Sequence, residues 1–260
     1  MDTLHIYSIA VCPFAQRTRI LLRLKDIPFE LHELDLTRPS DPDFLALNPS
    51  GQVPVIVHQG KVLNESSVIN EYLEDVFPAP PVFPSDPYKK AVARALIAYC
   101  NEQFIPAMYT LLMNQNPARD AQLTDQALET WARVDALLMR HNPEGTWLWD
   151  DSGFGMAELS YATFFQRYCL NAYYRGFELP NEERYARVRR WRDAMLPHPL
   201  VRETGMSDED YIKLYYDYAL GYGNGAVPPG RDRSSFDLSV PLAQRPMPSP
   251  DRPQPLPREL

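Results

Sequence analysis

The chain has 260 residues, of which 26 are Lys or Arg and 34 are Asp or Glu, giving a formal net charge of -8. Nucleic-acid binding needs basic side chains to neutralise phosphates, so this balance argues against a nucleic-acid partner. No apolar run approaches the ~20 residues that span a bilayer, and the N-terminus lacks a signal-peptide pattern, so we expect no membrane association. The three cysteines, Cys12, Cys100 and Cys169, cannot build a full disulfide framework, which favours a cytoplasmic protein.

Residues 1–78 predict a small α/β domain with the element order β-α-β-α-β-β-α. Strands and helices are distinguished by the period of their apolar residues, close to two in strands and 3.6 in helices. Gly60 suits the turn of a hairpin between the last two strands. The expected strands are 4–9, 29–36, 53–57 and 62–63, and the expected helices include 14–25 and 66–77.

A proline-rich stretch separates this domain from a second, helical one. Five prolines fall in residues 78–87, and we place a linker at 79–87 because proline cannot continue a helix. Residues 88–220 then predict an all-α domain in which Pro106 kinks the first helix. Residues 221–260 carry nine prolines and no periodicity, so they predict an extended tail that either wraps the body or is disordered. The expected helices are 86–114, 122–141, 155–174, 182–196 and 207–220.

Cys12 is the residue that most directly suggests chemistry. It follows the first strand and precedes Pro13, a residue favoured in the first turn of a helix. A cysteine at a helix N-terminus is expected to shift toward the nucleophilic thiolate, because unpaired N–H groups and the helix dipole stabilise an anion there. The other interpretation is a small buried hydrophobic residue. Because no second cysteine lies three residues on, an external thiol would have to release any mixed disulfide.

Two further pairs predict a binding site for a peptide-like ligand. Pro54 opens a strand, which is unusual unless the strand lies at a sheet edge or the Val53–Pro54 bond is cis. A cis bond would turn the Val53 backbone outward toward a ligand. Glu65 and Ser66 begin a helix, where N–H groups and a hydroxyl can hold a carboxylate and Glu65 can hold an ammonium group. The alternative for this second pair is an ordinary helix cap.

Taken in order, these motifs resemble the glutathione transferase superfamily. The resemblance implies a thioredoxin-like N-terminal domain, an all-α C-terminal domain and a homodimer. Cys12-Pro13-Phe14 resembles the omega class, whose catalytic residue is cysteine. The end of the chain further resembles the bacterial glutathione lyases of lignin β-aryl ether catabolism. The motifs are Cys12-Pro13-Phe14 with Arg17, Asn48 to Pro54, Glu65-Ser66, Asp86-Pro87, Lys213 to Tyr218, Gly223 to Gly225 and Arg245 to Pro248.

The resemblance also assigns roles to individual residues. Cys12 would be the catalytic thiolate, and glutathione would be bound as a co-substrate. Arg38 matches a family lysine that meets the glycyl carboxylate only if a one-residue gap is allowed. The expected glutathione-binding residues are Phe14, Arg38, Val53, Pro54, Glu65 and Ser66.

Three features of the helical domain leave alternatives open. Tyr211, Leu214, Tyr215 and Tyr218 form a helical stripe that predicts core packing, although Tyr218 matches a substrate-side tyrosine of the related lyases. Glu158 stands where an Asp is common in the family and is expected to be structural. An aromatic cluster is expected to be core, with a substrate pocket as the alternative. Its members are Trp147, Trp149, Phe164, Phe165, Tyr168, Tyr173 and Tyr174.

The expected function is cleavage of an aromatic glutathionyl thioether next to a ketone, through a Cys12–glutathione mixed disulfide that yields oxidised glutathione. One alternative is a general thioltransferase or dehydroascorbate reductase that uses the same cysteine. A second is conjugation or β-ether cleavage by glutathione itself, with Ser8 near enough in sequence to activate it. A third is a non-catalytic scaffold. The five histidines show no paired spacing for a metal, so no metal site is expected.

Overall fold

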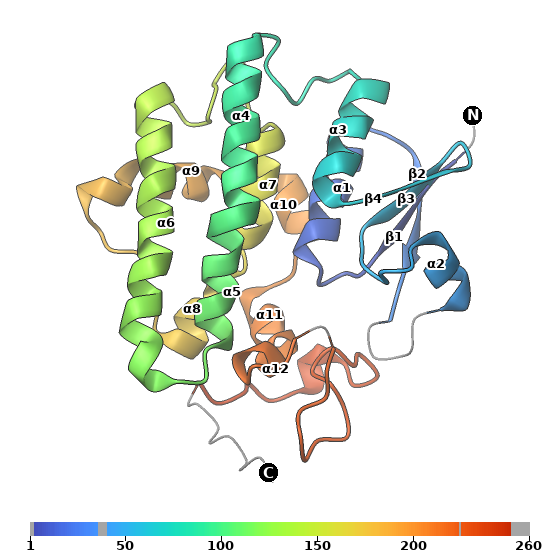
Figure 1. Ribbon diagram of the computed structural model, residues 1–260, viewed down its shortest axis with the longest axis vertical. Helices are drawn as coiled ribbons and strands as arrows, with labels where there is room; N and C mark the ends of the chain where they lie inside the picture. Colours follow the sequence, from blue (N-terminus) through green and yellow to red (C-terminus); the bar gives the residue numbers. More distant parts are fainter. Residues whose placement is uncertain (1–2, 36–40, 224, 251–260) are drawn as a thin grey trace.

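A computed structural model describes residues 3–35, 41–223 and 225–250, and it contains a four-stranded mixed sheet (Figure 1). The strands are β1 (Leu4–Ser8), β2 (Phe29–Glu33), β3 (Val55–His58) and β4 (Lys61–Asn64). Their spatial order is β2-β1-β3-β4, in which β2 is parallel to β1 while β3 runs antiparallel to both of its neighbours. This sheet confirms the predicted α/β fold of the N-terminal part.

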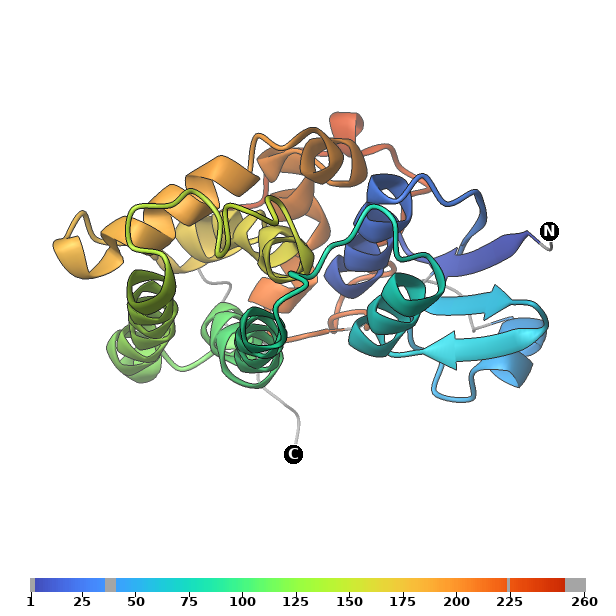
Figure 2. The ribbon, with the colours of Figure 1, turned by 90° about the horizontal axis from the view of Figure 1, so that it is seen from above.

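Two helices, α1 (Pro13–Leu24) and α3 (Ser66–Val76), pack side by side and lie between the sheet and the helical part of the molecule (Figures 1 and 2). They bury Ile20 and Ile69 against the strand residues Leu4 and Ile6. The short helix α2 (Pro42–Leu47) lies on the other side of the sheet. The observed order is the predicted β-α-β-α-β-β-α.

The expected strand at 53–57 begins two residues later, at Val55, because Pro54 has no N–H to donate to a ladder. The expected strand at 29–36 ends at Glu33. The turn at residues 59–60 joins β3 to β4 as predicted, and Gly60 has a φ of 71°, a conformation that glycine adopts without steric cost.

Helices make up most of residues 87–219, as expected for an all-α part (Figure 1). Two of the expected helices are interrupted, near residues 166–167 and at Tyr215, and the short helix α10 was not predicted. The helices are α4 (Pro87–Tyr99), α5 (Ile105–Met113), α6 (Asp120–His141), α7 (Met156–Phe165), α8 (Tyr168–Arg175), α9 (Ala186–Met195), α10 (Pro199–Thr204), α11 (Asp208–Leu214) and α12 (Tyr216–Ala219).

The kink expected at Pro106 takes the form of a π-helical turn, Cys100–Phe104, between α4 and α5. Pro106 has no N–H for the carbonyl one turn earlier, and the wider turn instead lets the Ile105 N–H bond to the Cys100 carbonyl. Arg17 of α1 contacts this turn through Asn101 (2.8 Å) and also donates to the Ser160 carbonyl of α7 (2.7 and 2.9 Å). The turn therefore helps to fix α1 against the helical part.

The C-terminal segment, residues 225–250, wraps the body in its described part. Asp217 of α12 is 1 % exposed and accepts hydrogen bonds from the Ser235 N–H (2.5 Å), the Ser234 hydroxyl (3.1 Å) and Arg231 (2.5 Å). These bonds hold the residues just before Phe236, whose ring packs in a small hydrophobic core together with Tyr215. Within the described residues, no helix combines the length and the apolar character that crossing a membrane requires.

Candidate active site

Cys12 is the N-cap residue of α1 and lies where the sheet meets the helical part. Its sulfur accepts a hydrogen bond from the Ala15 N–H at 3.5 Å and lies 3.8 Å from the Val53 carbonyl oxygen. Pro13 occupies the first turn, where a missing N–H costs nothing. The structure therefore confirms the predicted position of Cys12 at a helix N-terminus.

The residue before the cysteine is held by two side chains of the helical part. The Val11 carbonyl accepts from Arg167 Nη2 at 2.7 Å and from the Tyr215 hydroxyl at 3.1 Å. Arg167 is fully buried, lies over the Tyr211 ring and also donates to Gln16 of α1. Buried, well-partnered groups of this kind fix the backbone that they contact. Cys12 is thus positioned by two residues more than 150 positions away, a role that sequence reasoning did not assign to either of them.

Cys12 opens into a cleft of about 1170 Å³ between the sheet edge and the helical part. A pocket of this size can hold a tripeptide together with a second small molecule. The cleft brings together seven of the eight residues predicted to form the site. Those seven are Cys12, Phe14, Val53, Pro54, Glu65, Ser66 and Tyr218. The eighth, Arg38, lies outside the described residues.

The side of the cleft predicted to face a peptide-like ligand has the local geometry that its sequence predicts. The Val53–Pro54 bond is cis. Glu65 precedes α3 with a φ of 67°, in the left-handed region, and Ser66 is the first residue of that helix. Asn64 joins them at the same end of the cleft. The end of β4, a cis bond and the N-terminus of α3 therefore line the same cleft as the cysteine.

An aromatic wall stands on the other side of the cleft. It consists of Tyr109, Tyr215, Tyr218 and Phe236, and the ring of Tyr218 lies 5.0 to 5.8 Å from each of the other three. Sequence reasoning assigned Tyr215 to core packing and overlooked Tyr109 and Phe236. Phe236 sits in a segment with no helical or strand period, so no periodic signal could have identified it.

Other candidates lie elsewhere. Ser8, kept open as an activator of glutathione, is fully buried and is not among the described residues that line the cleft. None of the residues of the aromatic cluster in the helical part is among the described residues that line the cleft. Phe164 and Phe165, for example, are buried in the main core. The core interpretation of that cluster is therefore correct.

The expected shift of Cys12 toward thiolate is wrong for the free protein. Although Cys12 keeps some exposure to the cleft, burial by the surrounding protein raises the pKa of its thiol above the ordinary value of 9.0. The Ala15 N–H and the guanidinium groups of Arg167 and Arg19 lower this pKa, but they do not offset the burial. The helix N-terminus acts as predicted, and desolvation of the anion outweighs it.

This balance predicts how Cys12 reactivity depends on pH. Since the thiolate is the nucleophile and the pKa of Cys12 is raised, the rate of alkylation by iodoacetamide should keep rising as the pH passes 9.0. The measurement is the alkylation rate from pH 6 to 10, followed by peptide mass. A rate that reaches its plateau below pH 7 would contradict the raised pKa.

Glu158 is structural, as expected. It lies three residues into α7 and accepts from the N–H groups of Gly155 (3.1 Å) and Leu148 (2.8 Å) and from Trp191 Nε1 (2.9 Å). The first of these bonds is half of a capping box, in which a side chain three residues into the helix closes back on its start. One buried carboxylate therefore joins a loop and two helices.

Comparison with known proteins identifies the fold and shows which proteins this chain is similar to. Residues 11–76 match the family described as "Glutathione S-transferase, N-terminal domain". Residues 11–76 thus resemble the N-terminal domain of glutathione S-transferases, and the chain as a whole is similar to proteins of that name.

Relatives extend the similarity over most of the chain. Pig glutathione S-transferase omega-1 is 27% identical over 84% of this chain and 86% of its own length. Glutathione S-transferase U3 of Arabidopsis thaliana is 28% identical, over 77% and 88%. The crystal structure of rice GST1 in complex with glutathione superposes with a TM-score of 0.71 at 26% identity, covering 84% of this chain and 96% of that one. These findings confirm the expected fold, and the similar proteins include an omega transferase, as the resemblance implies.

Proposed function

We propose that this transferase is a glutathione-dependent thiol lyase that cleaves an aromatic glutathionyl thioether next to a ketone. The observation that carries the proposal is the cleft itself. Its wall on one side offers Cys12 and the peptide-facing residues, and its other side is built from four aromatic rings. An aromatic wall favours an aromatic second substrate, because ring pairs add to the free energy of simple burial.

In the proposed reaction, the Cys12 thiolate attacks the sulfur of the thioether. A sulfur–sulfur bond forms, the carbon–sulfur bond breaks, and its electron pair leaves as the enolate of the ketone. Protonation of the enolate releases the ketone, now reduced at carbon. A second glutathione thiolate then attacks the mixed disulfide and gives oxidised glutathione and free Cys12. We assign glutathione binding to Phe14, Val53, Pro54, Glu65, Ser66 and, outside the described residues, Arg38.

The nearest rival is a general thioltransferase or dehydroascorbate reductase, which would use Cys12 in the same way. The aromatic wall favours the lyase, since neither of those activities needs an aromatic acceptor site. Direct attack by glutathione, as in conjugation or ether cleavage, lacks support because Ser8 is buried away from the described cleft lining. A scaffold would need neither the cysteine nor the cleft.

The deciding experiment is intact mass after incubation with an aryl ketone thioether of glutathione, with free glutathione withheld. The proposal expects an added mass of about 305 Da together with an equivalent of released ketone, because attack on sulfur must leave a mixed disulfide. Ketone released only after free glutathione is added, with no adduct before that addition, would indicate direct attack by glutathione. A parallel incubation replaces the thioether by glutathione disulfide. An adduct that forms only in this second incubation would indicate a general thioltransferase.

Tyr218 is proposed to donate to the enolate oxygen as charge develops there. Tyr218→Phe removes the hydroxyl and keeps the ring, so kcat for the thioether should fall by about 10- to 100-fold with little change in KM. Tyr173→Phe is the matched control, because the Tyr173 hydroxyl donates to the Pro248 carbonyl in the C-terminal segment. Equal kinetics for Tyr218→Phe and wild type would remove Tyr218 from the mechanism.

Phe236 is proposed to select the aromatic acceptor. Its ring meets those of Tyr215 and Tyr218 edge to face, at 5.6 and 5.8 Å. Phe236→Ala should raise KM for an aryl thioether by about tenfold, which corresponds to the ~1.4 kcal/mol expected for one lost aromatic contact. KM for an alkyl thioether should change much less. The same change in KM for both substrates would show that Phe236 acts only through packing.

Three further expectations remain proposals. We propose domain limits of 1–78 and 88–220, with a linker at 79–87 and a C-terminal tail at 221–260. We also propose a cytoplasmic homodimer. Light scattering coupled to gel filtration measures its mass directly, and a monomer at micromolar concentration would contradict the dimer.

A further inference from the structure

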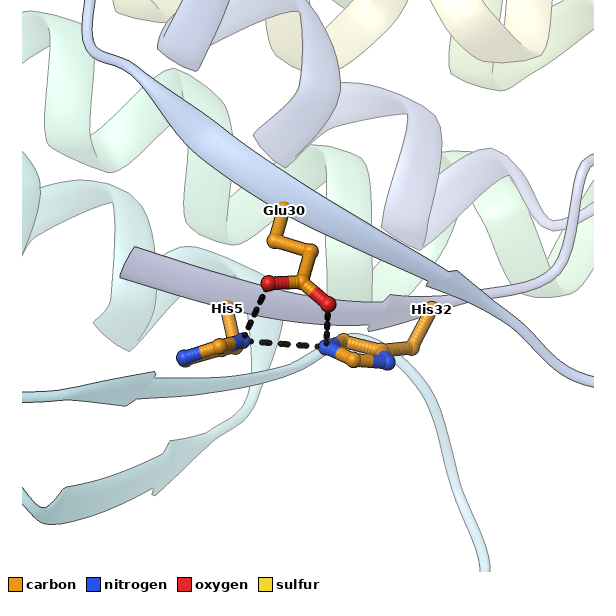
Figure 3. Close-up of side chains that lie close together, drawn as sticks. All are labelled: His5, Glu30 and His32. Atoms are coloured by element: carbon orange, nitrogen blue, oxygen red, sulfur yellow. Dashed lines mark hydrogen bonds and ion pairs between the residues drawn. The ribbon is translucent and has the colours of Figure 1, made fainter. Parts of the chain in front are cut away.

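A cluster of metal-ligating side chains lies on the sheet, outside the cleft. His5 is on β1, and Glu30 and His32 are on β2 (Figure 3). His5 is the direct strand partner of Glu30, and His32 lies two residues further along β2, so all three project from one face. This face is opposite to the one that buries Leu4 and Ile6. Since none of the three lines the cleft, the cluster does not depend on the proposed lyase.

The potential ligand atoms of the three side chains face one another, as Figure 3 shows. His5 Nδ1 lies 3.0 Å from His32 Nε2 and 3.5 Å from Glu30 Oε2, while His32 Nε2 lies 3.5 Å from Glu30 Oε1. In a tetrahedral zinc site with bonds of about 2.0–2.1 Å, neighbouring ligand atoms are about 3.3 Å apart. The two imidazole nitrogens are therefore spaced much like two corners of such a tetrahedron, and each Glu30 oxygen faces one of them. One potential ligand atom from each residue lies within 4.8 Å of the other two, so the carboxylate can supply the third ligand by a small rotation of its side chain.

The surroundings favour a bound cation. The His32 ring stacks on Tyr7 at 4.6 Å and 16°, which fixes its plane, and both strands are held by their ladder. Two imidazoles and one carboxylate are borderline and hard donors that suit zinc and similar first-row ions. The side chains of His5 and His32 keep 37% and 33% exposure, so the fourth corner faces solvent. Three protein ligands with one open position are typical of an accessible zinc site.

We propose that His5, Glu30 and His32 bind one divalent first-row ion of the zinc type, with water as the fourth ligand. Without metal, the 3.0 Å contact is a hydrogen bond in which one of the two facing nitrogens carries the proton. Metal binding moves that proton to the outer nitrogen of the same ring, so both facing nitrogens become ligands. No oxidant or further reactant is needed.

The test is calorimetric titration of the untagged full chain with Zn²⁺ at pH 7.5, after treatment with a chelator. All proteins carry Cys12→Ser, which removes the cleft thiol as a competing ligand. We expect one equivalent to bind and the melting temperature to rise with it. His5→Ala and His32→Ala should each weaken binding by more than about tenfold, and Glu30→Gln should weaken it as well. His141→Ala, which removes a histidine of α6, should leave it unchanged.

A second measurement uses only the protein in which His5, Glu30 and His32 are all intact, so it does not depend on how the cluster variants fold. Co²⁺ added to the Cys12→Ser protein should give the visible bands of a four- or five-coordinate site without a thiolate charge-transfer band. The proposal is overturned if Zn²⁺ does not bind at 100 μM, or if binding is the same in the His5 and His32 variants. Either result would show that the cluster is only a hydrogen-bonded ion pair.

Discussion

Replacing Cys12 by serine is expected to lower kcat/KM for an aryl ketone thioether of glutathione by more than about a thousandfold. A serine oxygen keeps the hydrogen bond from the Ala15 N–H but cannot form the mixed disulfide on which the proposed cycle depends. The measurement is ketone release under saturating glutathione, with product identified by mass. Because serine is close in size to cysteine, the fold and the melting temperature should change little.

Cys169→Ser is the matched control for this variant. Cys169 lies in α8, it is not among the described residues that line the cleft, and burial raises the pKa of its thiol to about 12. Its replacement should therefore leave the rate unchanged. If the Cys12→Ser protein keeps more than a tenth of the wild-type rate, the nucleophile is glutathione itself and not Cys12.

The largest loss of stability is expected from Glu158→Ala. The substitution leaves three buried donors without an acceptor, namely the N–H groups of Gly155 and Leu148 and Trp191 Nε1. Each unpaired donor costs about 1–3 kcal/mol, so the free energy of unfolding should fall by about 3–5 kcal/mol. The melting temperature should fall by roughly 10 °C, at about 2–4 °C per kcal/mol for a chain of this size. Urea denaturation followed by circular dichroism measures the loss.

Two companion variants separate the buried bonds from loss of charge. Glu158→Gln keeps one carbonyl oxygen and should recover part of the stability. Glu129→Ala removes a carboxylate that is 74% exposed and paired with Arg184, and exposed pairs contribute less than about 1 kcal/mol. A Glu158→Ala protein as stable as the Glu129→Ala protein would mean that water satisfies the three donors.

The sequence was sufficient where local signals determine structure. Periodicity and proline positions predicted the order of strands and helices in the N-terminal part, and the motif around Cys12-Pro13 predicted an N-cap cysteine. Pro106 predicted a disturbed helix but not that a π-helical turn would absorb the missing N–H. The pKa of Cys12 was misjudged because burial depends on the whole assembly, whereas the helix terminus is a local property.

Contacts between distant positions could not be predicted. His5 and His32 lie 27 residues apart and meet only because β1 and β2 pair in register. Arg167 reaches back to the Val11 carbonyl across the interface between the sheet and the helical part. Phe236 depends on Asp217 for its place, and neither residue belongs to a motif that identifies the other. Local sequence patterns predict local geometry, whereas contacts between distant residues depend on how the strands and helices are arranged in the fold.

The C-terminal segment contributes to the acceptor side of the cleft but not to the side that is proposed to bind glutathione. Every described residue proposed to bind glutathione precedes residue 67, whereas Phe236 reaches the cleft from the C-terminal segment, which the Asp217 carboxylate helps to hold. Amino-acid changes beyond residue 225 can therefore reshape the acceptor side while the cysteine and its neighbours keep their geometry. Natural drift in this stretch offers a route to new acceptor preferences, and a mutant library confined to it would sample them without rebuilding the nucleophile.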